Sequence, residues 1–243
     1  MAVFFLTLMI MIILKLLDLP LFAIVIITVA IMLALYIAIS IISHKKRLSL
    51  FENECDPEKF LLRTEKQKEI TGKNPKVKAL LDIDCAAALI LSGKFDEAKE
   101  VLLSIDKNKL SYRNGSLLAY TINLISCYYE LGEIDRAEEL YETQMPTLSP
   151  VNKRMMLAVN MLMAERFFFL KRYNESREYF NRLWKEKLSK CRRLEILYRL
   201  AQMDELEGNT ESAIKRYQKV ADNGNKLWIA AKAREKCRKT ESR

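Results

Sequence analysis

The chain has 243 residues, of which 50% are apolar and 29% charged, with only six Gly and five Pro. This composition excludes a strand-rich fold, which needs more turn residues, and indicates a mostly helical protein. The net charge of +9 is uneven, because residues 1–43 sum to zero, 44–76 to +3, 77–181 to −2 and 182–243 to +8. The basic character therefore follows the first apolar block and gathers at the carboxyl end.

Residues 1–43 are almost entirely apolar and too long for a single membrane span, which needs about 20 residues. A shorter segment, residues 2–17, is followed by Asp18 and Pro20 and then by a full segment, residues 21–42. We therefore expect a transmembrane anchor that forms a helical hairpin, with one long kinked helix as the alternative. No basic side chain or small-residue cleavage site marks the start as a secretory signal, so we expect no cleavage.

The residues that follow the apolar block predict the topology. Residues 44–47 read His-Lys-Lys-Arg, and positive residues beside a span stay on the cytoplasmic side. The five cysteines are widely separated and form no CxxC pair, which is typical of a reducing compartment. We expect an integral membrane protein whose remaining two hundred residues lie in the cytoplasm.

A basic juxtamembrane segment and a leading helix are expected over residues 44–76. Asp56, Pro57 and Glu58 read as a cap, a first-turn proline and an acidic first turn. The helix that they open is expected to end near Ile70, before Gly72.

One pattern of residue types occurs four times in the following part of the chain, with starts 39, 39 and 37 residues apart. Each copy predicts the end of one helix, a tight turn and the start of the next. Gly93, Gly132 and Gly208 can take the positive φ that ends a helix, and Lys171 stands at the equivalent place in the third copy. The four copies are SGKFDEAKEVLL from Ser92, LGEIDRAEELYE from Leu131, LKRYNESREYFN from Leu170 and EGNTESAIKRYQ from Glu207.

Three residues just after these turns are candidate helix caps. Asp96, Asp135 and Asn174 each carry a side-chain oxygen that can accept from free amides, and Glu138 would complete a capping box with Asp135. A small residue and, four positions later, a large one share the next helical face, so that two helices can approach closely. These pairs are Ala98 and Leu102, Ala137 and Tyr141, Ser176 and Phe180, and Ala213 and Tyr217.

This arrangement resembles the tetratricopeptide repeat family, in which helix-turn-helix units of about 34 residues stack on one another. The resemblance covers roughly residues 77–222. It implies an all-α fold in which residues 77–243 form a solenoid of about four repeats, ending in a closing helix over residues 227–239.

The sequence offers little support for catalysis. The single histidine, His44, lies in the basic stretch, and no phosphate-binding glycine motif or zinc spacing of Cys and His occurs. We therefore expect no enzyme activity, no catalytic, cofactor-binding or metal-binding residues, and no cofactor.

Partner binding is the expected function. The resemblance implies that the first helix of each repeat lines a concave groove, and the register makes this lining mainly apolar and aromatic. Such a groove suits an amphipathic helix or an extended apolar segment of a partner protein or peptide, and Phe168 fits a core position equally well. We expect a non-catalytic, membrane-tethered scaffold whose groove contains Ile83, Ile90, Ile122, Tyr129, Met161 and Phe168.

A basic surface gives the alternative function, which is binding of anionic lipid. Nucleic acid ranks below lipid, because only Trp184 and Trp228 stand among the charges as candidate stacking aromatics. A reversed topology would instead give an exported array that acts in envelope assembly. The basic surface comprises Arg182, Lys185, Lys187, Lys190, Arg192, Arg193, Lys232, Arg234 and Lys236.

Overall fold

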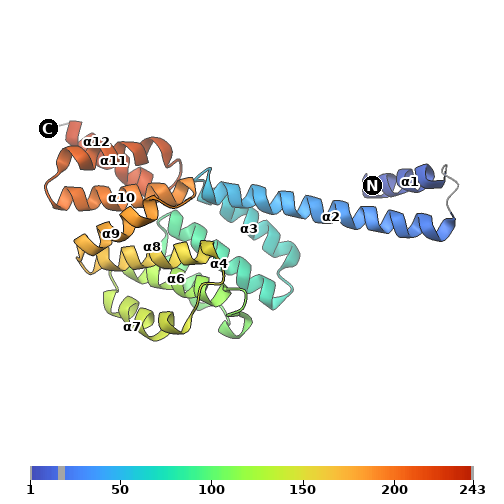
Figure 1. The fold of residues 1–243 in the computed structure, drawn as a ribbon, viewed down its shortest axis with the longest axis horizontal. Helices are drawn as coiled ribbons and strands as arrows, with labels where there is room; N and C mark the ends of the chain where they lie inside the picture. Colours follow the sequence, from blue (N-terminus) through green and yellow to red (C-terminus); the bar gives the residue numbers. More distant parts are fainter. Residues whose placement is uncertain (1, 16–19, 242–243) are drawn as a thin grey trace. The chain divides into compact units, whose positions relative to one another are not determined.

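The computed structural model describes residues 2–15 and 20–241, and all regular secondary structure in these ranges is helical (Figure 1). The chain separates into two compact units, residues 1–48 and 49–243. The all-α fold class predicted from composition and repeat pattern is confirmed.

The first unit contains α1 (Ala2–Lys15) and most of α2 (Leu21–Glu52). The two helices run antiparallel, with the Thr7 hydroxyl 3.7 Å from the Met32 sulfur (Figure 1). Among the described helices, α2 is the one long and apolar enough to cross a bilayer, by length and composition. The predicted reversal at Asp18 lies outside the described residues, and the membrane anchor over residues 1–43 stays a prediction.

The second unit begins with the predicted leading helix, α3 (Pro57–Thr71). A carboxylate oxygen of Asp56 accepts from the Lys59 amide at 3.0 Å, so the predicted cap is present. Four helical hairpins follow, and then a closing helix. They are α4 (Pro75–Leu91) with α5 (Phe95–Leu103), α6 (Ser116–Glu130) with α7 (Ile134–Gln144), α8 (Lys153–Phe169) with α9 (Tyr173–Trp184), α10 (Lys190–Leu206) with α11 (Thr210–Asn223), and α12 (Trp228–Glu241), with short 3-10 turns η1 (Lys107–Lys109) and η2 (Met145–Thr147) between hairpins.

The four hairpin turns have the same backbone geometry. Gly93, Gly132 and Gly208 have φ of 77°, 76° and 80°, as their positions predicted. Lys171 takes the same left-handed conformation, with φ of 60°, although a side chain there costs roughly 1 kcal/mol. The third repeat therefore keeps the turn despite lacking its glycine.

The caps predicted for the second helices of the repeats are wrong. Asp96, Asp135 and Asn174 lie inside the first turns of α5, α7 and α9, because the left-handed residue reverses the chain sharply and the next helix starts two residues later. Asp96 and Asp135 still place negative charge beside a helix N-terminus, which is favourable. The residues at the cap positions are Lys94, Glu133, Arg172 and Asn209, and none makes a side-chain capping bond.

The small positions lie where the two helices of each hairpin meet. Ala98, Ala137 and Ser176 are fully buried and Ala213 nearly so. The Ser176 hydroxyl donates to the Ala164 carbonyl at 2.8 Å, so the two helix backbones approach closely there. This close approach confirms the repeat register.

Asp204 occupies a position that is aromatic in two of the other repeats, and it is buried. Its carboxylate pairs with Arg177 and Arg216, each at 2.9 Å, and accepts from the Ser212 hydroxyl at 2.7 Å. An ion-pair cluster therefore replaces aromatic packing where the third and fourth repeats meet.

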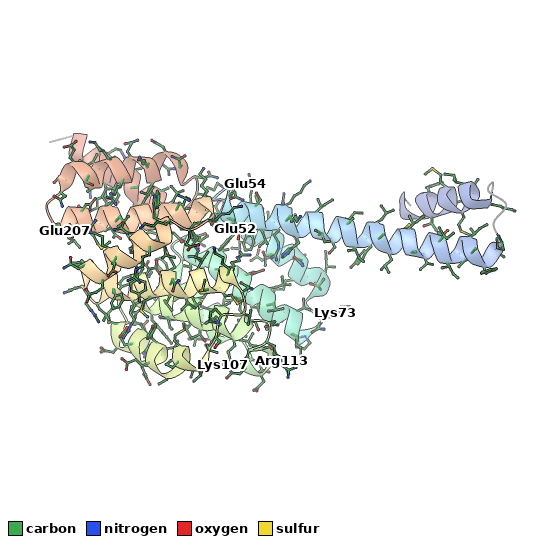
Figure 2. The ribbon with its side chains drawn as sticks, viewed as in Figure 1. Glu52, Glu54, Lys73, Lys107, Arg113 and Glu207 are labelled. Carbon is green, nitrogen blue, oxygen red and sulfur yellow. The ribbon has the colours of Figure 1, made fainter. Side chains whose placement is uncertain are left out.

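The end of the second unit packs against its beginning. The Trp228 ring meets Phe95 edge-on with centroids 5.5 Å apart. The Lys226 amide donates to the Cys55 carbonyl at 3.2 Å, and the Asn225 side chain donates at 2.8 Å to the carbonyl of Glu54. Figure 2 labels Glu54, which lies just past the end of α2. The closing helix and the loop before it therefore pack against the first repeat and the segment before α3.

Candidate functional site

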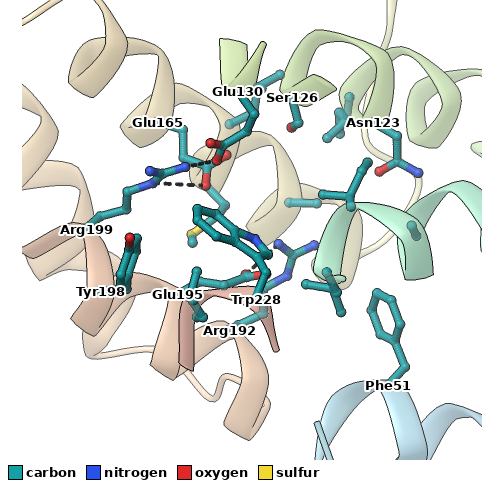
Figure 3. Close-up of a pocket in the computed structure, with 18 residues that line it drawn as sticks. Phe51, Asn123, Ser126, Glu130, Glu165, Arg192, Glu195, Tyr198, Arg199 and Trp228 are labelled. Atoms are coloured by element: carbon teal, nitrogen blue, oxygen red, sulfur yellow. Dashed lines mark hydrogen bonds and ion pairs between the residues drawn. The ribbon is translucent and has the colours of Figure 1, made fainter. Parts of the chain in front are cut away.

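The first helices of the four repeats surround an interior cavity (Figure 3). Phe51, from the end of α2, and Trp228 and Ile229, from α12, complete its lining. The cavity volume is about 70 Å³, which is room for a few water molecules. The concave side of the array is thus filled mainly by the chain itself.

Charged side chains cross this interior. Arg199 is 5% exposed and pairs with Glu130 and, at 3.8 Å, with Glu165 (Figure 3). Arg192 pairs with Glu195 at 2.9 Å. Three carboxyl groups therefore face two guanidinium groups in a mostly buried space.

Aromatic rings pack against the buried Arg199, and the pKa of the neighbouring Glu165 is shifted. The Arg199 guanidinium lies 5.0 Å from the ring centroids of both Phe168 and Phe169, in cation–π geometry. Burial raises the pKa of Glu165 to about 7, opposed by Arg199 and reinforced by the other carboxylates, Glu195 first. Glu165 therefore titrates near neutral pH.

The predicted groove residues separate into two groups. Ile90, Ile122 and Met161 line the interior cavity. Ile83 and Tyr129 are buried in the packing between helices, and Phe168 is half-buried against Arg199.

Tyr129, which the sequence placed in a partner-binding groove, is instead a core residue that is 1% exposed. Its hydroxyl donates to Glu138, and its ring stacks on Phe169 with centroids 5.1 Å apart. Glu138 in turn forms a two-pronged ion pair with Arg166, with Nε–Oε1 at 2.9 Å. The capping box predicted for Glu138 is therefore replaced by a bridge between the second and third repeats.

A second hollow lies outside the interior and has a volume of about 520 Å³. We call it the outer cleft. It is bounded by the end of α2, the first half of α8, the end of α9 and the loop that leads to α10. Its apolar floor contains Phe51, Leu157, Ala158, Met161, Leu183 and Leu188, and its rim contains Lys153, Arg154, Lys187, Arg192 and Glu52.

The rim of the outer cleft is basic. Arg154 pairs with Glu52 at 2.6 Å, and Lys153 pairs with Glu186 at 2.9 Å. Lys187 is exposed and makes no ion pair within the described part of the chain. Both α8 and α10 begin here without an acidic residue in their first turns, so their positive dipole ends add to the basic side chains.

Of the nine basic residues predicted as one surface, four form ion pairs, and one of these is Arg192 with Glu195. Arg182 pairs with Glu178, Lys232 with Glu235 and Lys236 with Glu205. Arg193 and Arg234 donate to backbone carbonyls. Three lysines around the turn from α9 to α10 are exposed and form no ion pair among the described residues: Lys185, Lys187 and Lys190. Of these three, only Lys187 lines the outer cleft.

The charged interior was the feature that sequence reasoning missed. Charged residues at concave register positions, such as Glu165, were the available signal, but their pairing with Arg199 depends on how far the array curves. No cluster of three or more His, Cys, Asp or Glu side chains suited to a metal ion occurs within residues 2–15 and 20–241.

Comparison with known proteins identifies the repeat. A family model described as tetratricopeptide repeat matches residues 195–223, which span most of α10 and all of α11. Searches of curated proteins and of solved structures returned no match. The matched hairpin shares its left-handed turn and its buried small residue with the three hairpins before it. The match confirms the predicted resemblance to tetratricopeptide repeats over the fourth hairpin.

Proposed function

We propose that this protein is a non-catalytic, membrane-tethered scaffold that binds a protein partner at the outer cleft. The observation that supports this proposal best is an apolar-floored cleft of about 520 Å³ on an array of interaction repeats. Its volume falls within the range of about 300–1,000 Å³ typical of binding pockets.

The position of the site differs from the concave groove expected from the sequence. An α-helix with its side chains is about 10 Å across, whereas the interior cavity holds about 70 Å³. A partner helix could enter only if α12 and Phe51 left their places. The outer cleft needs no such rearrangement.

The tether is supported by α2, whose apolar side chains are largely exposed between Leu21 and Ile42. The basic residues 44–47 favour a cytoplasmic position for the array. All five native cysteines are buried, so a new cysteine is needed to report topology. Asn108→Cys, in an exposed turn, should react with an impermeant maleimide only after the membrane is opened. Labelling in intact cells would reverse the proposed orientation.

Partner binding is tested by placing a charge in the floor of the outer cleft. Leu157→Asp should abolish affinity capture of the partner from membranes, because a buried carboxylate opposes apolar docking. Met156→Asp is the matched control, since Met156 is the adjacent residue, is 45% exposed and lies outside the cleft. Helicity and melting temperature of both variants should be checked by circular dichroism. Equal capture by both folded variants would exclude the outer cleft as the binding site.

A second candidate function is contact with anionic lipid through the turn from α9 to α10. Lys185, Lys187 and Lys190 support it, because they are exposed and unpaired within the described residues. Each basic side chain near an anionic surface contributes about 1 kcal/mol. Neutralising Lys185 and Lys190 should then weaken salt-sensitive binding to phosphatidylserine vesicles while leaving partner capture unchanged. Nucleic acid ranks lower still, because Trp228 packs inside the array.

A further inference from the structure

We infer that the outer cleft takes an acidic apolar segment of the partner, in which an aromatic or aliphatic side chain stands next to carboxylates. This inference rests on the proposed function, because it assumes that the occupant is a protein. It adds the chemical class of the segment and the rim residue that selects it.

The charge of the rim indicates that the occupant is acidic. Four basic side chains and one acidic side chain line the outer cleft. Lys187 has no ion pair among the described residues, so its ammonium group is available to an incoming carboxylate. The starts of α8 and α10 add positive potential at the same rim. An acidic segment is attracted to this surface, and a basic one is repelled.

Two consecutive residues at the end of α2 already occupy one side of the outer cleft. Phe51 is half-buried against the floor, and the neighbouring Glu52 carboxylate pairs with Arg154 at 2.6 Å. An apolar ring beside a carboxylate is therefore a combination that this surface accepts. The free volume next to Phe51 and Glu52 can hold a second such pair from another chain.

The arrangement of cations favours a peptide over a lipid headgroup. Arg154 is on α8, Lys187 is on the loop before α10, and Arg192 is on α10. These elements border the same floor, so separate carboxylates along a peptide can each meet a cation while apolar side chains fill the space between them. The cations that already have partners here are Lys153, Arg154 and Arg192, and each pairs with a carboxylate, at 2.9, 2.6 and 2.9 Å.

The test uses the full chain in phosphatidylcholine nanodiscs and a fluorescein-labelled peptide in which Phe and Leu alternate with Asp and Glu. Fluorescence anisotropy should show binding that weakens as salt is added. Lys187→Glu should weaken it roughly tenfold, because an attraction becomes a repulsion. The matched control is Lys185→Glu, which makes the same charge change at an exposed lysine outside the outer cleft and should leave binding unchanged.

Three results would overturn the inference. Equal losses in the Lys187→Glu and Lys185→Glu variants would show diffuse attraction without a site. Equal binding of a peptide with Lys in place of Asp and Glu would show that the outer cleft does not prefer acidic segments. Binding of water-soluble dihexanoyl phosphatidylserine that depends on Lys187, without binding of the acidic peptide, would make the cleft a lipid site.

Failure of the inference can be told from failure of the proposed function. One outcome is that the peptide does not bind, while partner capture still fails in Leu157→Asp and survives in Met156→Asp. The proposed function then stands, and only the inference that the partner segment is acidic is disproved. If capture is the same in both variants, the cleft is not the partner site, whatever the peptide does.

Discussion

The interior cavity and the outer cleft are neighbouring hollows that differ in volume and lining. They share Phe51, Ala158, Met161 and Arg192 as walls. The interior holds about 70 Å³ and contains paired, mostly buried charges, whereas the cleft holds about 520 Å³ and has an apolar floor with its charges at an exposed rim. The repeat register determines which side chains face inward. The positions of α12 and of the end of α2 determine which of the two hollows a partner can reach.

The largest expected effect concerns the buried charges of the interior. Arg199→Ala leaves Glu130 and Glu165 without their guanidinium and should lower the free energy of unfolding by about 3–5 kcal/mol. Arg154→Ala at the rim of the outer cleft should cost at most about 1 kcal/mol, because that pair is exposed to solvent. Urea unfolding followed by circular dichroism measures both. Similar losses for the two variants would mean that the interior is as well solvated as the rim.

The next effect follows from the raised pKa of Glu165, which is about 7 in the folded protein against an ordinary value of 4.5. A raised carboxyl pKa means that the folded state holds the proton more tightly, so stability is complete at low pH and falls as pH rises through 7. Glu165→Gln should therefore raise the free energy of unfolding by about 2–3 kcal/mol at pH 8 and change it little at pH 4. Urea unfolding at the two pH values measures this difference, and a gain independent of pH would contradict the raised pKa of Glu165.

A smaller effect tests the register that lines both hollows. Ala137 is fully buried where α6 and α7 meet. Ala137→Leu should lower the free energy of unfolding by about 1–3 kcal/mol through overpacking. A thermal unfolding curve that matches the parent protein would remove the register from which both linings follow.

The smallest effect tests the closure itself with two equivalent glycines. Gly93 and Gly132 have nearly the same φ, so alanine adds the same backbone strain of about 1 kcal/mol at each. A Cβ at Gly93 would lie 2.8 Å from the Trp228 Cβ, whereas one at Gly132 meets nothing within 4 Å. Gly93→Ala should therefore cost about 1 kcal/mol more than Gly132→Ala in urea unfolding. Equal costs would mean that α12 does not press against the first repeat in solution.

Local patterns predicted the local structure well, with one instructive failure. Gly93, Gly132 and Gly208 marked the turns correctly, because a positive φ is a property of the residue and its immediate neighbours. The caps at Asp96 and Asp135 failed by two residues, since the exact start of a helix depends on how sharply the preceding turn reverses the chain. Boundaries at this scale are the least certain part of a sequence prediction.

The sequence by itself determined the helices, the hairpin register and the apolar character of the repeat faces, because these follow from spacing along one chain segment. Only the tertiary structure decided that Tyr129 is core, that Arg199 meets Glu130 across 69 residues, and that Trp228 closes the array against Phe95. Those contacts depend on the curvature accumulated over four hairpins, a small rotation at each interface that no local pattern records.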